Sequence, residues 1–259
     1  TYWYTYICTD NQHEYYEALL NTLNFRYNLR AELPSLKSAR DIGRMGRDFF
    51  SFFRSRVLNH RPLIKDPFAF FSAPWFSDQF KCQVVITIRH PAAFVSSLKR
   101  LHWPFDLGDL LKQPLLMRDF LEPYQAEIEN TCKNPDDEIG HNSLLWKIIY
   151  EIVREFQYKY PQIHLARHED LSIQPHEGFS RLYEKLDLNF TPQAGKAITA
   201  STNSENPIEL SRHSVHSTQL NSIANLTNWK HRLTKDEISR IREITSEAAE
   251  MFYPDIDWT

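Results

Sequence analysis

The run Val84–Ile88 is the segment that most limits what this chain can fold into. It is rich in β-branched residues, which favour an extended strand. Its side chains are apolar on both faces, as in a central strand of a parallel sheet. A helical pattern follows at 91–101, with Pro91 in its first turn. The sequence therefore predicts a buried strand that leads through a short connection into a helix.

Apolar residues recur with strand or helix periodicity along the rest of the chain. Two short apolar runs, 62–65 and 163–166, predict further strands. Helices are expected at 13–23, 41–57, 143–158, 176–186, 192–200 and 235–251. Because strands separated by long helices pair in parallel, the pattern predicts an α/β fold, a parallel sheet with crossover helices. No linker divides the chain, so we expect a single domain over residues 1–259, with a long polar loop at 201–221.

Composition excludes several classes of protein. The chain has only six glycines, which argues against an all-β sandwich, and its formal net charge of −3 argues against a general nucleic-acid binder. Cys8, Cys82 and Cys132 are far apart and odd in number, so we expect reduced thiols and a cytoplasmic protein. No apolar run approaches the roughly 20 residues of a membrane span. No cluster of acidic residues or histidines has metal-ligand spacing, so we expect no metal.

Arg89 stands where the predicted strand ends and the next helix begins. Ligands of open α/β sheets bind beyond the carboxyl ends of the strands. A helix N-terminus near Pro91 would aim free N–H groups at the same place, and an arginine fork suits a phosphate. Ser97, about two helical turns further on, would add a hydroxyl donor. The alternative is an arginine that pairs with a surface carboxylate, and this motif alone leaves both readings open.

Several motifs, in order along the chain, resemble those of the sulfotransferases that use the donor PAPS. In that family a strand ends in an arginine, and a serine eight positions later helps it hold the donor's 3′-phosphate; Arg89 and Ser97 have this spacing. Residues 167–171 (RHEDL) resemble the family's R-Y-E-D-L segment, and residues 228–234 (NWKHRLT) resemble its D-W-K-x-x-F-T segment. Residues 63–65 (LIK), expected as a short strand that ends in lysine, are a fourth match.

The resemblance extends from residue 62 to the C-terminus and implies a P-loop-NTPase-like sulfotransferase architecture. It implies PAPS as sulfuryl donor, PAP as product and no metal. Beside Arg89 and Ser97, it assigns the donor nucleotide to four further residues: His168, Ser222, Asn225 and Trp229. His168 replaces the tyrosine usual near the adenine, where it can stack or hydrogen-bond; the alternative is a partly buried histidine whose hydrogen bonds are made by Glu169 or the backbone. Ser222 and Asn225 stand where the family has a basic segment, so they could act only as neutral donors.

The resemblance also indicates two catalytic residues. Lys65 would stabilise the charge that develops on the leaving nucleotide phosphate. Family members in the cytosol carry a histidine base two positions after this lysine, where this chain has Pro67. Asp66 is adjacent and could accept the proton of the acceptor instead, if it lies within hydrogen-bond reach. The alternative for Asp66 is a turn residue that caps the local backbone.

One family element has no counterpart between Thr1 and Thr259. It is the segment G-x-P-x-S-G-T-T-W, whose backbone N–H groups hold the 5′-phosphosulfate. Gly43 and Gly46 form the nearest glycine pair, but they lie within a helical pattern. We therefore expect that the first strand and its phosphate loop are missing from this chain.

These observations predict an enzyme that transfers a sulfuryl group from PAPS to a hydroxyl or amine. Its partners would be the nucleotide donor and a small-molecule, carbohydrate or lipid-like acceptor, without nucleic acid and without a membrane span. Two alternatives stay open. One is a nucleotide kinase-like phosphotransferase, and the other is a non-catalytic module that binds a nucleotide or a protein on the same fold.

Overall fold

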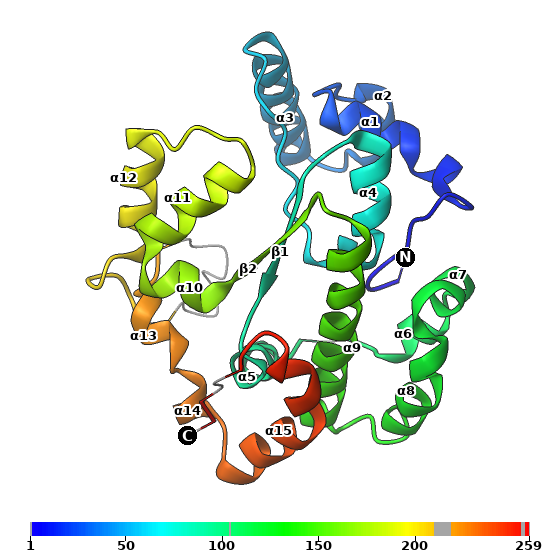
Figure 1. Cartoon of the computed structure of the whole chain (residues 1–259). Coiled ribbons are helices and arrows are strands. Elements are labelled where there is room, and N and C mark those ends of the chain that lie inside the picture. The colour runs from blue at the N-terminus through cyan, green and yellow to red at the C-terminus, as the bar shows by residue number, and fades with distance from the viewer. Residues whose placement is uncertain (1, 104, 210–218, 255–256, 259) are drawn as a thin grey trace.

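The computed structural model describes residues 2–103, 105–209, 219–254 and 257–258, and helices dominate this part of the chain (Figure 1). The two strands are β1 (Val84–Ile88) and β2 (Ile163–Arg167). The helices are α1 (Tyr16–Leu23), α2 (Leu29–Glu32), α3 (Ala39–Val57), α4 (Ala73–Phe80), α5 (Pro91–Leu101), α6 (Gly108–Leu111), α7 (Pro114–Leu116), α8 (Gln125–Thr131), α9 (Glu138–Lys159), α10 (His168–Ile173), α11 (Pro175–Lys185), α12 (Pro192–Thr202), α13 (Ser222–Leu226), α14 (Trp229–Arg232) and α15 (Lys235–Glu250). Short 3₁₀ and π-helical turns lie between some of them.

The prediction of an α/β fold with a P-loop-NTPase-like sulfotransferase architecture is wrong. Within the described ranges only β1 and β2 pair, in parallel, from Val84 opposite Ile163 to Ile88 opposite Arg167. β1 is not a central strand, since most of it is only half-buried and Thr87 is exposed. A two-stranded pair leaves most of the core to helices, so the molecule is mostly helical.

The prediction of a strand at 62–65 is also wrong. These residues form an exposed coil, in which Leu63 has 91% of its surface accessible. A short apolar run is compatible with a strand only if another strand lies beside it to take its hydrogen bonds. Nothing in the run itself specifies such a neighbour.

The predicted helices are confirmed to within a few residues, and their ends carry the expected signals. α5 has the predicted bounds and begins with Pro91. α9 starts after Asp137, whose carboxylate accepts the N–H of Gly140 at 3.0 Å. α15 starts with a reciprocal pair, because Thr234 caps the N–H of Glu237 while Glu237 accepts the N–H of Thr234. The polar loop expected at 201–221 lies partly outside the described residues.

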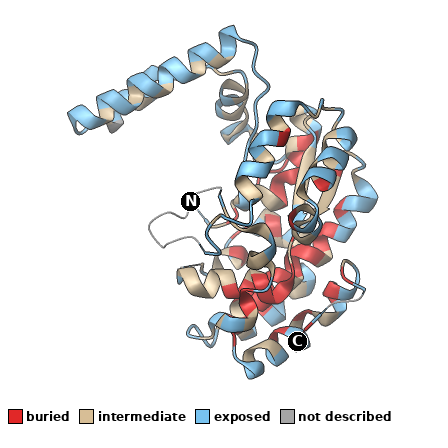
Figure 2. Ribbon diagram, turned by 90° about the vertical axis from the view of Figure 1, so that its left-hand side faces the viewer, coloured by how far each residue is buried: buried red, intermediate tan, exposed pale blue. Residues whose placement is uncertain are grey.

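The core is built around α9, which crosses the centre of the molecule and packs against α5, α15 and β2 (Figures 1 and 2). Its largest fully buried side chains are Trp146 and Phe156. A second, smaller apolar cluster joins α5, α14 and α15 and contains Trp229. Together these clusters fix the carboxyl ends of β1 and β2 against the N-terminus of α5.

No helix among the described residues is both long enough and apolar enough to cross a membrane.

Candidate functional site

Polar side chains gather where β1 and β2 end. The parallel register sets Ile88 opposite Arg167. The residues that follow, Arg89 after β1 and His168 after β2, therefore leave the pair at the same edge. The sequence predicted this place for Arg89, and the pairing of β1 with β2 brings His168 beside it.

Arg89 is a half-buried arginine whose guanidinium has no hydrogen bond or ion pair within the described residues. Burial is the main reason that its pKa lies below the usual value. The charge of Glu169 opposes this shift, and the charge of Arg232 adds to it. The alternative, in which Arg89 pairs with a surface carboxylate, is not observed among the described residues. Glu169 is the nearby carboxylate, but its oxygens accept hydrogen bonds from other groups.

His168 lies beside Arg89 and also has an unused polar atom. Its Nδ1 is buried without a hydrogen-bond partner among the described residues. Burial lowers the pKa of His168, and the positive charge of Arg89 lowers it further. The ring is therefore neutral near neutral pH, and in one tautomer its Nδ1 carries a proton that it can donate.

Glu169 links His90 to Tyr253 through hydrogen bonds at this edge. One of its oxygens accepts the backbone N–H of His90 at 2.9 Å, and the other accepts the hydroxyl of Tyr253 at 2.7 Å. Burial and the nearby carboxylate raise the pKa of Tyr253, so the phenol keeps its proton. Arg167 lies over the ring of Tyr253, 4.5 Å from its centre. Glu169 thus balances the local positive charge without occupying the guanidinium of Arg89.

The N-terminus of α5 is partly capped by the protein itself. The Nδ1 of His90 accepts the N–H of Ala92 at 3.2 Å, and Pro91 has no N–H to offer. The expected row of free N–H groups is therefore shortened, because His90 and Ala92 both have partners. Any anion at this edge depends more on Arg89 and His168 than on the helix dipole.

Trp229, which was predicted to bind the donor nucleotide, has little surface open to a ligand. It is 4% exposed and stacks on the imidazole of His90, with ring centres 4.9 Å apart and planes 11° from parallel. Its place in α14, packed against α5, fixes the start of α5 from behind. The tryptophan therefore positions the site and does not line it.

The other predicted donor residues, Ser97, Ser222 and Asn225, differ in how many of their hydrogen-bonding groups are already used within the chain. Ser97 is half-buried within α5, and no hydrogen bond of its hydroxyl is present among the described residues. The Ser222 hydroxyl lies 2.9 Å from the carbonyl of Ser172 in α10 and 3.3 Å from that of Thr202, so its proton is already used. Asn225 accepts from Asn228 at 3.2 Å through its carbonyl oxygen, which leaves its NH₂ group to donate. Ser222 is thus tied to the scaffold, while Ser97 and Asn225 keep donors.

Lys65 and Asp66 lie in the exposed coil before the 3₁₀-helix Pro67–Ser72. One carboxylate oxygen of Asp66 accepts the N–H of Phe68 at 2.8 Å, as expected of a capping residue. No contact joins either residue to Arg89 or His168 within the described ranges. The structure therefore does not bring the two predicted catalytic residues together with the predicted anion site.

Sequence reasoning missed Arg232 and Tyr253. Arg232 lies in the segment 228–234 that carries Trp229, and its charge reaches Arg89. Both Nε and Nη2 of Arg232 bond to the same oxygen of Glu209, at 3.0 and 2.6 Å. The only signal for Arg232 was its place in that motif, while Tyr253 comes from the end of the chain without any motif.

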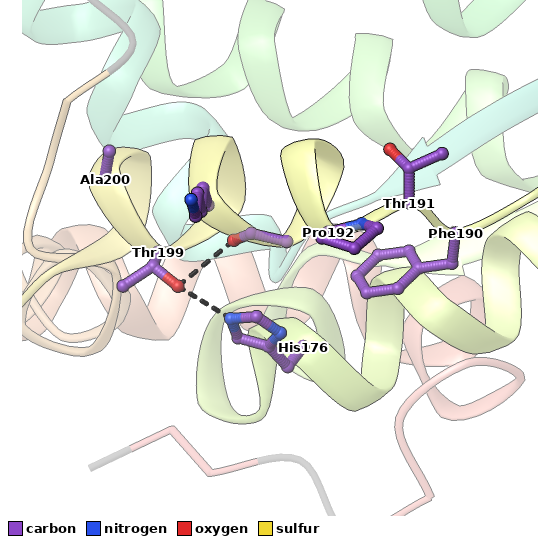
Figure 3. Close-up of a pocket in the computed structure, with 8 residues that line it drawn as sticks. His176, Phe190, Thr191, Pro192, Thr199 and Ala200 are labelled. Carbon is purple, nitrogen blue, oxygen red and sulfur yellow. Dashed lines mark hydrogen bonds between the residues drawn. The ribbon is translucent and has the colours of Figure 1, made fainter.

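Two cavities lined by described residues lie elsewhere or only touch this edge. One, of about 610 Å³, is an open groove between α11 and α12 that contains none of the predicted residues (Figure 3). In it His176 lies 2.7 Å from the hydroxyl of Thr199, which itself donates to the carbonyl of Gly195. The second, of about 480 Å³, includes Arg167 and Asp170. The described residues hold no group of three His, Cys, Asp or Glu side chains arranged for a metal ion.

Because Arg89 is partly buried and its guanidinium has no hydrogen bond or ion pair within the described ranges, we expect it to cost the folded protein stability. Arg89→Met should raise the free energy of unfolding by about 1 kcal/mol, since it removes a partly buried charge whose desolvation Glu169 offsets only in part, and it keeps an apolar stem. Urea denaturation at neutral pH measures this. Arg242→Met, at an exposed arginine of α15, serves as the control and should change little. A loss of stability in Arg89→Met would mean that the guanidinium has protein partners after all.

Comparisons of the chain with protein-family models, with curated proteins and with solved structures give no match.

Proposed function

We propose that this chain is a sulfotransferase that holds the 3′-phosphate of its PAPS donor at the carboxyl edge of β1 and β2. One observation supports this most. Arg89 and His168 leave the paired strands at the same edge, the charge of Arg89 reaches the His168 ring, and neither the guanidinium nor the Nδ1 has a hydrogen-bond partner in the described part of the chain. Buried donors without partners are costly, so such a pair favours a ligand that accepts hydrogen bonds.

A phosphate matches the chemistry of this pair. Arg89 would give two parallel N–H bonds to phosphate oxygens, and neutral His168 would donate a third from its Nδ1–H tautomer. Ser97 and the NH₂ group of Asn225 are the neutral donors assigned to the same nucleotide. The motifs at 167–171 and 228–234 point to a 3′-phosphonucleotide rather than to another anion. The proposal depends on these side chains and motifs and not on a particular sheet architecture.

In the proposed reaction, the acceptor oxygen or nitrogen forms a new bond to the sulfur of PAPS. The bond between this sulfur and the bridging phosphate oxygen breaks, and PAP leaves with the electron pair. The acceptor's proton passes to a base. We assign Lys65 to the charge on the leaving oxygen and Asp66, through its carboxylate, to the proton. The exposed coil at Lys65 and Asp66 leaves both groups accessible to substrates.

Calorimetric titration with PAP and with 5′-AMP, which lacks the 3′-phosphate, tests the donor site. Wild type should bind PAP at least about tenfold more tightly than 5′-AMP, since charge-assisted hydrogen bonds contribute about 1.5–3 kcal/mol. Arg89→Ala should lose this preference and bind both nucleotides alike. Arg242→Ala, at an exposed arginine of α15, should behave as wild type.

The same titration distinguishes the alternatives. If folded wild type does not bind PAP, or binds PAP and 5′-AMP equally, the sulfotransferase proposal fails. If PAP binds but PAPS is not consumed with any of phenol, sugar or amine acceptors, the chain is a nucleotide-binding module without transfer activity. Consumption of PAPS that depends on Lys65 supports the full proposal.

A further inference from the structure

The helix α3 carries an exposed apolar surface that nothing in the described chain covers. We define its aromatic face by five residues, Ile42, Phe49, Phe50, Phe53 and Val57. Each is more than a third exposed; the values for Phe50, Phe53 and Val57 are 64%, 55% and 65%. No residue of α3 is buried, and Figure 2 shows a long helix of this kind projecting from the body. Such a concentration of exposed phenylalanine and aliphatic surface marks an interaction site.

The aromatic face is one side of the helix, and basic residues follow its border. Apart from the adjacent Phe49 and Phe50, its members recur at spacings of three, four and seven residues, which places them along one side of an α-helix. Arg40, Arg47 and Arg54 are seven residues apart and form a row along the flank. Since the helix has 19 residues, this row and the face extend for roughly 28 Å.

Another side of α3 packs against residues of the same chain. Phe52 packs against Phe25 and Tyr27, with ring centres 6.1 and 5.4 Å apart. Phe49, at the edge of the aromatic face, also touches Tyr27 at 6.2 Å. The segment before α3 therefore supports the helix from behind and leaves the aromatic face directed outward.

The charge of α3 differs in sign from that of the protein. The helix contains five arginines and two aspartates, whereas the whole chain has a formal net charge of −3. Asp41 pairs with Arg44 at 3.4 Å and Asp48 with Arg47 at 3.2 Å. No acidic side chain of the described residues pairs with the other arginines of the helix, which are Arg40, Arg54 and Arg56. An acidic partner is therefore the electrostatic complement of this helix.

We propose that α3 binds an anionic lipid surface, with the helix parallel to the membrane and the aromatic face in the headgroup region. Helices with phenylalanine on one face and arginine on the other lie in this interface without crossing it. The arginine row would meet lipid phosphates along its whole length. A second copy of the chain fits less well, because it would bring the net positive charge of one α3 against that of the other. The inference is independent of the donor site.

Vesicle flotation of the full chain tests this. The vesicles consist of phosphatidylcholine alone or of phosphatidylcholine with phosphatidylglycerol. Wild type should float with the anionic vesicles and stay behind with the neutral ones, and added salt should release it. Phe50→Ser/Phe53→Ser should weaken binding about tenfold, and Arg47→Gln/Arg54→Gln should do the same for anionic vesicles. All four positions are exposed, so circular dichroism should show unchanged folding.

Two controls address other exposed residues of the same kinds. Tyr158→Ser, at a 91% exposed aromatic residue of α9, and Arg242→Gln, at an exposed arginine of α15, should float as wild type. Equal flotation of wild type and the phenylalanine variant overturns the proposal, as does no flotation of wild type. If light scattering without lipid shows a dimer that Phe50→Ser/Phe53→Ser separates, the face belongs to a second copy and the lipid proposal is wrong.

Discussion

Replacing Trp146 by alanine is expected to lower the free energy of unfolding by about 4 kcal/mol. Trp146 is fully buried at the centre of α9. Its indole N–H donates to the carbonyl of Arg89 at 2.9 Å, and its ring packs 4.5 Å from that of Tyr150. The substitution would leave a large cavity in the core and an unpaired carbonyl next to the candidate site.

Urea denaturation of a graded series measures the two contributions. Trp146→Phe keeps most of the ring and loses the hydrogen bond, so we expect a smaller loss of about 1–3 kcal/mol. Tyr158→Ala, on the same helix but 91% exposed, should stay within about 0.5 kcal/mol of wild type. If Trp146→Ala cost no more than Tyr158→Ala, the core would not be organised around this tryptophan as described.

The helices could be predicted because their signals are local. The periodicity of α9 and the proline at the start of α5 lie within each segment, and both helices are found where expected. The extended conformation of β1 is also local, since β-branched residues favour it. The strand that pairs with β1, however, is distant in the sequence. Pairing with β2 links residues about 80 positions apart, and the sequence could not show that only two strands pair.

The wrong prediction of a strand at 62–65 also results from strand pairing that is not local in the sequence. A run of apolar residues predicts burial, but Leu63 is almost fully exposed. Whether such a run becomes a strand depends on a hydrogen-bonding neighbour that must come from elsewhere in the chain. The inferred sheet was therefore larger than the one observed, and the architecture was predicted wrongly although most of its elements were right.

The candidate site was predicted in part for a similar reason. Arg89 was identified because it follows a predicted strand, and His168 because it lies in a segment that resembles a family motif; parallel pairing then sets both at one edge. The contacts that decide their chemical state are distant in sequence. Glu169 meets Tyr253 across 84 residues, and this bond keeps its carboxylate off Arg89. Trp229 was identified by its motif, but only the fold shows that it stacks on His90.

The pH dependence of stability should depend strongly on His90, which is 8% exposed. The pKa of His90 is lowered from 6.5 to about 4, mainly by burial and to a smaller extent by the charge of Lys230, against the carbonyl of Asp257 and the charge of Glu169. The folded protein therefore keeps the ring neutral where the unfolded chain protonates it. Stability is complete above about pH 6.5 and falls as the pH drops toward about 4. The loss from this one group should reach about 3 kcal/mol.

The variant His90→Asn isolates this effect from that of other titrating groups. Asparagine is a good N-cap residue, so its oxygen can still accept the N–H of Ala92, but it does not titrate. The free energy of unfolding, measured by urea between about pH 7 and pH 4, should fall less steeply in the variant than in wild type. His13→Asn, at an exposed histidine, should follow the wild-type curve. Parallel curves for wild type and His90→Asn would mean that His90 is protonated equally in both states. The Asp257 carbonyl and the stacked Trp229 would then surround a charged ring, and the start of α5 would not be held by a neutral imidazole.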